Sequence, residues 1–206
     1  MEASTTMQPG AVNRTAGVWG ILALLTLGLL ISFIDRTSLS AALADKNFIA
    51  EFSLSNVDRG WLNSAFFWSY GLMQLPMGWL VDRYGVKWPY AFCFCLWCAA
   101  TALTGLVTAL AGLIVMRLIV GATEAIVIPA SYRWIGSNMS ESHKGLAAGI
   151  LSMGGKFGPA IGAPIAAWLI VSHSWKLMFV LTGLLGLLLL VPWLNCVRND
   201  LPPKAE

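Results

Sequence analysis

Charge is scarce in this sequence. Of its 206 residues, 11% are Asp, Glu, Lys or Arg and 57% are hydrophobic, whereas soluble globular chains carry about 25% charged residues. This composition excludes a mainly water-soluble fold and predicts a protein embedded in a lipid bilayer. Because a membrane span needs about 20 apolar residues, a chain of this length accommodates five or six spans and leaves no room for a sizeable soluble domain.

Other features are lacking too, and each absence excludes a class of function. No basic run is interleaved with aromatic residues, so nucleic acid is not expected as a partner. No nucleophile is accompanied by a base and no glycine loop is of the phosphate-binding kind, so we expect neither an enzyme nor a cofactor. The polar N-terminus lacks the charged start of a cleaved signal peptide, and the first apolar run is expected to remain as an anchor.

A metal site is not expected either. Cys93, Cys95 and Cys98 lie close together, but no histidine or acidic residue is near them and the second pair of a zinc array is missing. We interpret them as small residues of a lipid-embedded helix. His143 and His173 are expected in loops, in solvated or structural roles.

Six apolar segments alternate with loops that hold nearly all of the charge. These are residues 19–43, 61–81, 89–110, 113–135, 146–170 and 177–194. Because unpaired backbone groups are costly in lipid, each is predicted to be a transmembrane helix. The expected fold is an all-α membrane protein with a six-helix bundle at 18–195, a cytoplasmic tail at 1–17 and the start of a cytoplasmic linker at 196–206.

The distribution of Lys and Arg predicts the orientation. If the N-terminus is cytoplasmic, the cytoplasmic flanks carry seven of these residues and the opposite flanks carry three. Cytoplasmic loops are enriched in Lys and Arg. We therefore expect both termini in the cytoplasm and the protein in the inner membrane.

Five ionisable residues fall inside the apolar segments: Asp35, Arg36, Arg117, Glu124 and Lys156. A charge at mid-bilayer costs about 2.5–3.5 kcal/mol, so such residues are candidates for function. Arg117 and Glu124 are seven residues apart and share one helix face, which should look inward. Asp35 and Arg36 are adjacent and point about 100° apart, so one addresses a cavity and the other a neighbouring helix.

The same stretch of sequence supplies hydrogen-bonding groups. Tyr70 and Gln74 are four residues apart and form a polar stripe on one helix face. The excess of positive charge favours an anionic solute, and buried carboxylates could exchange protons. An alternative is that the charges only pair with one another and stabilise the bundle.

The fifth apolar segment is rich in glycine and proline between residues 154 and 164. Small residues permit close helix packing, and proline weakens a helix. Two interpretations stay open, bending of this helix during a transport cycle and packing alone.

Residues 78–87 resemble the signature loop between the second and third helices of the major facilitator superfamily. The matching residues are Gly78, Asp82, Arg83, Gly85 and Lys87. Glycine permits a tight turn, Asp82 can cap or pair across helix ends, and the basic residues hold the loop in the cytoplasm. The resemblance implies a latch that holds the inward-closed state.

Three further stretches, 33–39, 70–76 and 117–125, are similar to the anion:cation symporter branch of that superfamily. Its members take up sugar acids and other organic anions together with protons. The resemblance implies that Asp35 and Glu124 couple transport to protons.

It further implies that Arg36 or Arg117 engages the carboxylate of the substrate or sets the pKa of the two acidic residues, and that Tyr70 hydrogen-bonds to the substrate. We add Gln74 and Lys156 as candidate substrate-binding residues. The fifth segment departs from the sugar-acid members, which often carry a neutral polar side chain here. The extra cation in this segment, Lys156, favours a more highly charged anion as the substrate.

The family builds twelve helices as two six-helix bundles, with the substrate bound between them. This chain corresponds to one bundle, expected as a 3+3 inverted repeat with its junction at 108–112. We expect the N-terminal half of a proton-coupled organic-anion transporter that works by alternating access, with the bilayer, the anion and protons as partners. Alternatives are a truncated, non-transporting fragment, a ligand sensor, and assembly with a second copy or a separate C-terminal half.

Overall fold

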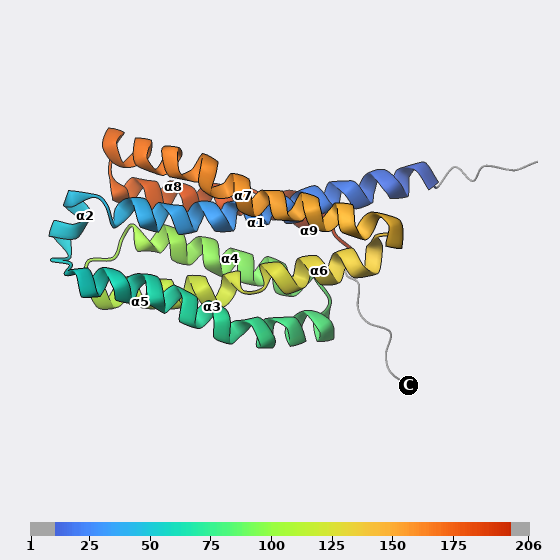
Figure 1. Cartoon of the computed structure of the whole chain (residues 1–206), viewed down its shortest axis with the longest axis horizontal. Coiled ribbons are helices and arrows are strands. Elements are labelled where there is room, and N and C mark those ends of the chain that lie inside the picture. Colours follow the sequence, from blue (N-terminus) through green and yellow to red (C-terminus); the bar gives the residue numbers. More distant parts are fainter. Residues whose placement is uncertain (1–10, 199–206) are drawn as a thin grey trace, which may run out of the picture.

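The computed structural model of the chain describes residues 11–198, so the outer parts of the two predicted tails, 1–10 and 199–206, lie outside the described residues. All regular structure within 11–198 is helical, which confirms the all-α part of the predicted fold class. The helices are α1 (Ala11–Ala42), α2 (Lys46–Glu51), α3 (Asn56–Tyr84), α4 (Lys87–Thr104), α5 (Leu110–Glu124), α6 (Val127–Asn138), α7 (Glu141–Ser172), α8 (Trp175–Leu187) and α9 (Leu190–Cys196). The long helices run roughly parallel to one axis and pack side by side (Figure 1).

Each predicted apolar segment is mostly helical in the structure, although the helix of the third segment, predicted at 89–110, ends at Thr104. Four stretches are long and apolar enough to cross a membrane: Gly17–Ala42, Leu110–Asn138, Glu141–Ser172 and Trp175–Cys196. The second and third predicted spans correspond to α3 and α4, which are not among these four. Membrane crossing by these two helices therefore stays a prediction.

The fourth and sixth predicted spans are each interrupted by a two-residue turn, which the sequence analysis did not predict. The interruptions separate α5 from α6 and α8 from α9. Pro129 and Pro192 follow these turns at the third position of α6 and α9. Proline has no N–H that could donate to the carbonyl group four residues earlier, so one backbone hydrogen bond of the helix is missing at each break.

Local capping interactions define the ends of α2 and α3. The Asp45 carboxylate accepts a hydrogen bond from the Phe48 N–H at 2.9 Å, which starts the short, unpredicted helix α2. Ser55 and Asp58 form a capping box at the start of α3, and the hydrogen bonds from Ser55 to the Asp58 carboxylate lower the pKa of Asp58. Gly85 ends α3 with a φ of 79°, a conformation that glycine adopts without strain.

Glycines let the helices of the bundle approach one another closely. Gly154, Gly158 and Gly162 are spaced by four residues and form one face of α7 against α1. A Cβ atom at Gly158 would lie 2.6 Å from the Phe33 Cβ atom and 2.8 Å from the Leu30 carbonyl oxygen. This is the small-residue packing common between membrane helices. Of the two open interpretations of this segment, packing is therefore observed, and α7 stays one helix.

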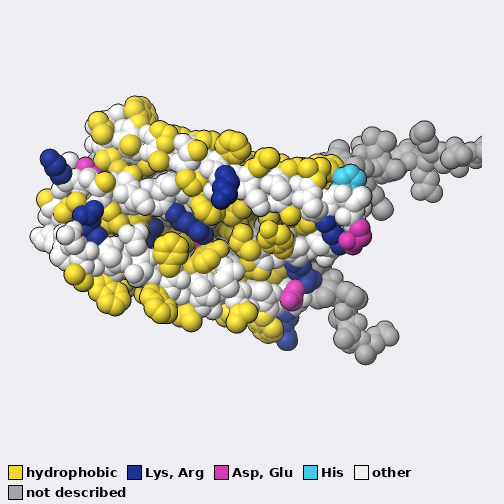
Figure 2. All heavy atoms as spheres, viewed as in Figure 1, with side chains coloured by type: hydrophobic (Ala, Val, Ile, Leu, Met, Phe, Trp, Pro, Cys, Tyr) yellow, Lys and Arg dark blue, Asp and Glu magenta, His cyan; other side chains and the backbone are white. Residues whose placement is uncertain are grey.

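The apolar side chains divide between a buried core and an outer surface. The largest buried side chains include Tyr90, Phe94, Trp97 and Trp193, which belong to one cluster. Many large apolar side chains are exposed on the outside, and Figure 2 shows hydrophobic side chains along the whole length of the bundle. Exposure of this extent is unfavourable in water and fits a lipid environment.

We expect Gly158→Ala to lower the apparent melting temperature of the chain in detergent, because the added methyl group collides with the backbone of α1. Overpacking of this kind costs about 1–3 kcal/mol. The matched control is Gly149→Ala on the same helix, where a Cβ atom meets nothing within 4 Å. Equal melting temperatures for the two variants would contradict the packing of α1 on α7.

Candidate functional site

Three of the five predicted intramembrane charges are buried inside the bundle. The exposed fraction is 2% for Asp35, 2% for Arg117 and 0% for Glu124. Asp35 lies on α1, and the other two lie on α5. Charged groups this deep in an apolar bundle are costly unless they are paired, so their contacts decide what the site can do.

Glu124 is held by α1. Its Oε2 atom accepts hydrogen bonds from Ser32 Oγ at 2.8 Å and from Arg36 Nε and Nη2 at 3.0 Å each. The Arg36–Glu124 ion pair therefore joins α1 to the end of α5. Arg117 shares the α5 segment with Glu124 but is not its ion-pair partner.

Asp35 points to a different helix from its neighbour Arg36, as expected for adjacent helical residues. Its Oδ2 atom accepts hydrogen bonds from Trp97 Nε1 and, at 3.3 Å, from Thr101 Oγ1, both on α4. Asp35 thus fixes α1 to α4, while Arg36 faces α5.

The Arg36 guanidinium also lies over three aromatic rings. Its central carbon is 4.6 Å from the centre of the Phe33 ring, 4.9 Å from that of Phe66 and 4.7 Å from that of Tyr70. Such contacts stabilise a cation by about 0.5–2 kcal/mol each. Tyr70 therefore lies at the predicted site. Phe66 was not predicted, although its spacing of four residues from Tyr70 on one helix face could have indicated it.

Several buried polar atoms of this site lack a partner among the described residues. They are Arg117 Nε and Nη2, Asp35 Oδ1 and Glu124 Oε1. A buried polar group without a hydrogen bond costs about 1–3 kcal/mol, and more when it is charged. The Arg117 guanidinium has only the Phe179 ring, whose centre is 5.5 Å away, as an aromatic neighbour. The site thus holds hydrogen-bonding capacity that the described residues do not use.

Arg36 and Arg117 line one cavity of about 130 Å³, which we call the inner cavity. Its other lining residues are Leu39, Ser40, Asn63, Phe66 and Phe67. Two guanidinium groups, a hydroxyl and an amide thus line one small space, together with the rings of Phe66 and Phe67. This combination suits a carboxylate that carries neighbouring hydroxyl groups.

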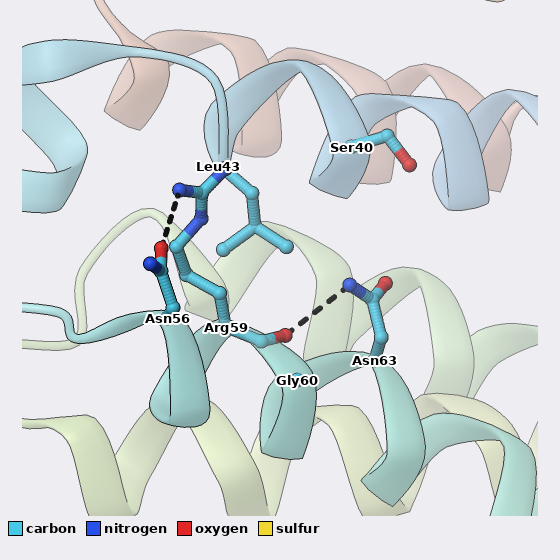
Figure 3. Close-up of a pocket in the computed structure, with 6 residues that line it drawn as sticks. All are labelled: Ser40, Leu43, Asn56, Arg59, Gly60 and Asn63. Carbon is cyan, nitrogen blue, oxygen red and sulfur yellow. Dashed lines mark hydrogen bonds between the residues drawn. The ribbon is translucent and has the colours of Figure 1, made fainter.

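A second, more open cavity of about 400 Å³, which we call the outer cavity, adjoins the first at the loop end of α1 and α3 (Figure 3). It is lined by Ser40, Leu43, Asn56, Arg59, Gly60 and Asn63. Ser40 and Asn63 line both cavities. The sequence analysis missed these residues, although Asn56, Arg59 and Asn63 share one face of α3 and their polar spacing was a usable signal.

Three predicted substrate-binding residues, Tyr70, Gln74 and Lys156, line neither cavity, although the Tyr70 ring contacts the Arg36 guanidinium. Gln74 is partly buried on α3, one turn beyond Tyr70, and Lys156 is exposed on α7. Gly155 contacts α1 instead, since a Cβ atom there would lie 3.2 Å from the Phe33 ring. The structure thus brings Asp35, Arg36 and Glu124 together with Arg117 and Tyr70. Gln74 and Lys156 lie apart from this group.

The predicted latch loop lies at the opposite end of α3 and contacts α6. Asp82 Oδ1 is 2.5 Å from Arg133 Nη1, and a Cβ atom at Gly78 would lie 3.9 Å from the Pro129 Cβ atom. The Asp82 side chain is 70% exposed. Arg133 was missed by the sequence analysis because it follows Asp82 by 51 residues.

The basic residues of the loop contact other parts of the same end. Lys87 Nζ donates a hydrogen bond to the Leu194 carbonyl oxygen at 2.7 Å, and Trp193 Nε1 donates one to the Lys87 carbonyl oxygen at 3.1 Å. The Arg83 guanidinium lies 5.5 Å from the centre of the Trp79 ring. The loop therefore ties the start of α4 to α9.

No cluster of three or more His, Cys, Asp and Glu residues that could hold a metal ion is found between residues 11 and 198. Cys93 and Cys98 are buried, Cys95 is exposed, and all three are free thiols.

Similar sequences include named transporters. The chain is 34% identical over 193 residues to a "Probable galactarate/D-glucarate transporter" of Bacillus subtilis. The aligned region covers 91% of this chain and 42% of the relative. It is 32% identical over 189 residues to the "Hexuronate transporter" of Escherichia coli, with 90% and 43% covered. The chain thus spans less than half the length of these relatives. Such similarity agrees with the resemblance to the anion:cation symporter branch.

A solved structure has the same fold. It is a bacterial homologue of the human lysosomal transporter Spinster in an inward-facing, unoccupied conformation, with a TM-score of 0.79 and 24% identity over 92% of this chain and 46% of that chain. At this identity the likeness concerns the fold alone. Residues 25–206 match the family described as Major Facilitator Superfamily. Since that match includes most of the chain, the protein belongs to the Major Facilitator Superfamily.

Proposed function

We propose that this chain is the N-terminal half of a secondary transporter for organic anions of the sugar-acid class, and that the cavity between Arg36 and Arg117 binds the substrate carboxylate. One observation carries the proposal. Arg117 is buried with two nitrogens that lack partners, beside a second guanidinium on the same cavity. A carboxylate would satisfy both nitrogens through charge-assisted hydrogen bonds. The names of the relatives, which transport galactarate, D-glucarate and hexuronate, support this substrate class.

The remaining cavity groups suit the rest of a sugar acid. Ser40 and Asn63 can each donate and accept hydrogen bonds, and they lie where the inner cavity opens into the outer one. Aromatic carbons of Phe66 and Phe67 line the same cavity. A carboxylate would therefore sit at the two arginines, with the polyhydroxylated part of the molecule directed outward.

The contacts of Arg36 supply a route for proton coupling. The guanidinium of Arg36 holds Glu124 Oε2, while Oε1 of Glu124 is free of hydrogen bonds. A substrate carboxylate that takes over Arg36 leaves Glu124 buried without its counter-charge, and a proton then neutralises it. Substrate and proton thus enter together. Asp35, with its own free oxygen, is the second coupling carboxylate.

The proposed topology places α1, α3, α4, α5–α6, α7 and α8–α9 as six spans of the inner membrane, with both termini cytoplasmic. Lys and Arg enrichment on one side supports it. The contact between Asp82 and Arg133 then lies on the cytoplasmic side. We assign it as the latch of one end state of an alternating-access cycle, completed by a second bundle.

Binding to the chain in lipid nanodiscs tests the substrate assignment. We expect D-glucarate to bind and a neutral sugar not to bind, and Arg117→Gln to weaken D-glucarate binding by about 10-fold or more, since a hydrogen bond to a charged group contributes about 1.5–3 kcal/mol. Lys176→Gln is the control, because Lys176 pairs with Glu51 outside both cavities. Wild-type affinity in the Arg117 variant would refute the site.

The latch assignment predicts that Asp82→Asn loosens α3 from α6 without changing ligand affinity. An exposed ion pair contributes only about 0–1 kcal/mol, so we expect an unchanged fold and a Kd for D-glucarate within twofold of wild type. Spin labels at Tyr84→Cys and Gly136→Cys, both exposed in the structure, in a chain whose exposed Cys95 and Cys196 are replaced by serine, should give a broader distance distribution in the Asp82→Asn variant. An unchanged distribution would count against the latch.

A further inference from the structure

We propose that the outer cavity is an anion-recruiting vestibule, in which Arg59 attracts and first engages a carboxylate that then moves to Arg36 and Arg117. The identity of the anion rests on the proposed function, whereas the recruitment itself does not. The proposal concerns the cavity of about 400 Å³ that opens at the loop end of α1 and α3.

The two cavities form one path. Ser40 follows Arg36 by one helical turn on α1, and Asn63 follows Arg59 by one turn on α3, steps of about 6 Å. Both intermediate residues line the outer and the inner cavity. Figure 3 shows Arg59 and Asn63 on α3 facing the helix that carries Ser40. An anion can therefore pass from one guanidinium to the next along hydrogen-bonding groups.

The charge of Arg59 has no acidic partner among the described residues. Its side chain donates one hydrogen bond, from Nη1 to Asn56 Oδ1 at 3.3 Å, and this partner is neutral. Arg59 is also the sole charged residue in the lining of the outer cavity.

The acidic residues at this end of the bundle are engaged elsewhere. Glu51 pairs with Lys176 at 2.6 Å, Asp45 caps α2, and Asp58 is hydrogen-bonded to Ser55. None of them forms an ion pair with Arg59, so the positive charge of Arg59 is not neutralised by a direct partner and can act on solutes. A cleft lined by one sign of charge raises the local concentration of the opposite ion and accelerates its entry, by about 10–1,000-fold in strong cases.

The sizes of the cavities support a two-stage path. The inner cavity, at about 130 Å³, is smaller than the roughly 300–1,000 Å³ of typical ligand pockets, and the outer cavity adds the missing space. Because steering scales with the charge of the solute, a dianion such as D-glucarate should gain more from Arg59 than a monoanion such as D-galactonate.

Thiol chemistry in the cavity measures the proposed potential directly. Ser40→Cys is introduced into a chain whose two exposed cysteines, Cys95 and Cys196, are replaced by serine. The rates of reaction with a negatively and a positively charged methanethiosulfonate reagent are then compared in nanodiscs. We expect Arg59→Gln to lower the ratio of the anionic to the cationic rate by about 3–10-fold, and Arg59→Lys to preserve it.

Lys176→Gln is the matched control, since it removes a cation at the same end that is already paired with Glu51. Its ratio should stay within twofold of the parent chain. A ratio that does not respond to Arg59→Gln overturns the vestibule.

A second experiment asks whether D-glucarate slows the labelling of the introduced thiol. If the ratio responds but no sugar acid protects the thiol, the vestibule stands and the proposed substrate class is refuted.

Discussion

The ion pair between Arg36 and Glu124 is the interaction on which the rest of the site depends. It joins α1 to the end of α5 in an apolar interior, where Glu124 is fully buried. A buried ion pair is expensive to desolvate, and removal of either partner leaves an uncompensated charge. In the proposed function, an anion that enters the neighbouring cavity competes with Glu124 for the same guanidinium, and the site exchanges one negative charge for another.

Close helix packing makes this arrangement rigid. The glycine face of α7 brings its backbone against α1, on the side where Phe33 lies, and Phe33 in turn supports the Arg36 guanidinium from one side. On α1, Asp35 is anchored to Trp97 of α4. Because α1 is held by neighbours on several sides, its two adjacent charges keep different directions, one toward α4 and one toward α5.

The sequence was sufficient for the long helices and for the three buried charges, because long apolar runs and isolated charges within them are local signals. It was insufficient for the pairing. Glu124 shares a segment with Arg117, yet its partner is Arg36, 88 residues away, and only the tertiary arrangement of the helices, which brings this end of α5 within reach of α1 side chains, decides this. Ser40 and Asn63 were missed for the same reason, since each is an ordinary polar residue until two helices place it between cavities. Lys156 was a strong local signal, but its side chain is exposed on α7 and lines neither cavity.

Infrared difference spectroscopy of the chain in nanodiscs, recorded on addition of D-glucarate, tests the exchange of charges at Arg36 most directly. The account predicts that the carbonyl stretch of a protonated carboxylic acid side chain appears on binding and is absent in Glu124→Gln. Saturating D-glucarate without this band in the wild-type chain, or with the same band in the variant, would contradict the claim that substrate displaces Glu124 from Arg36.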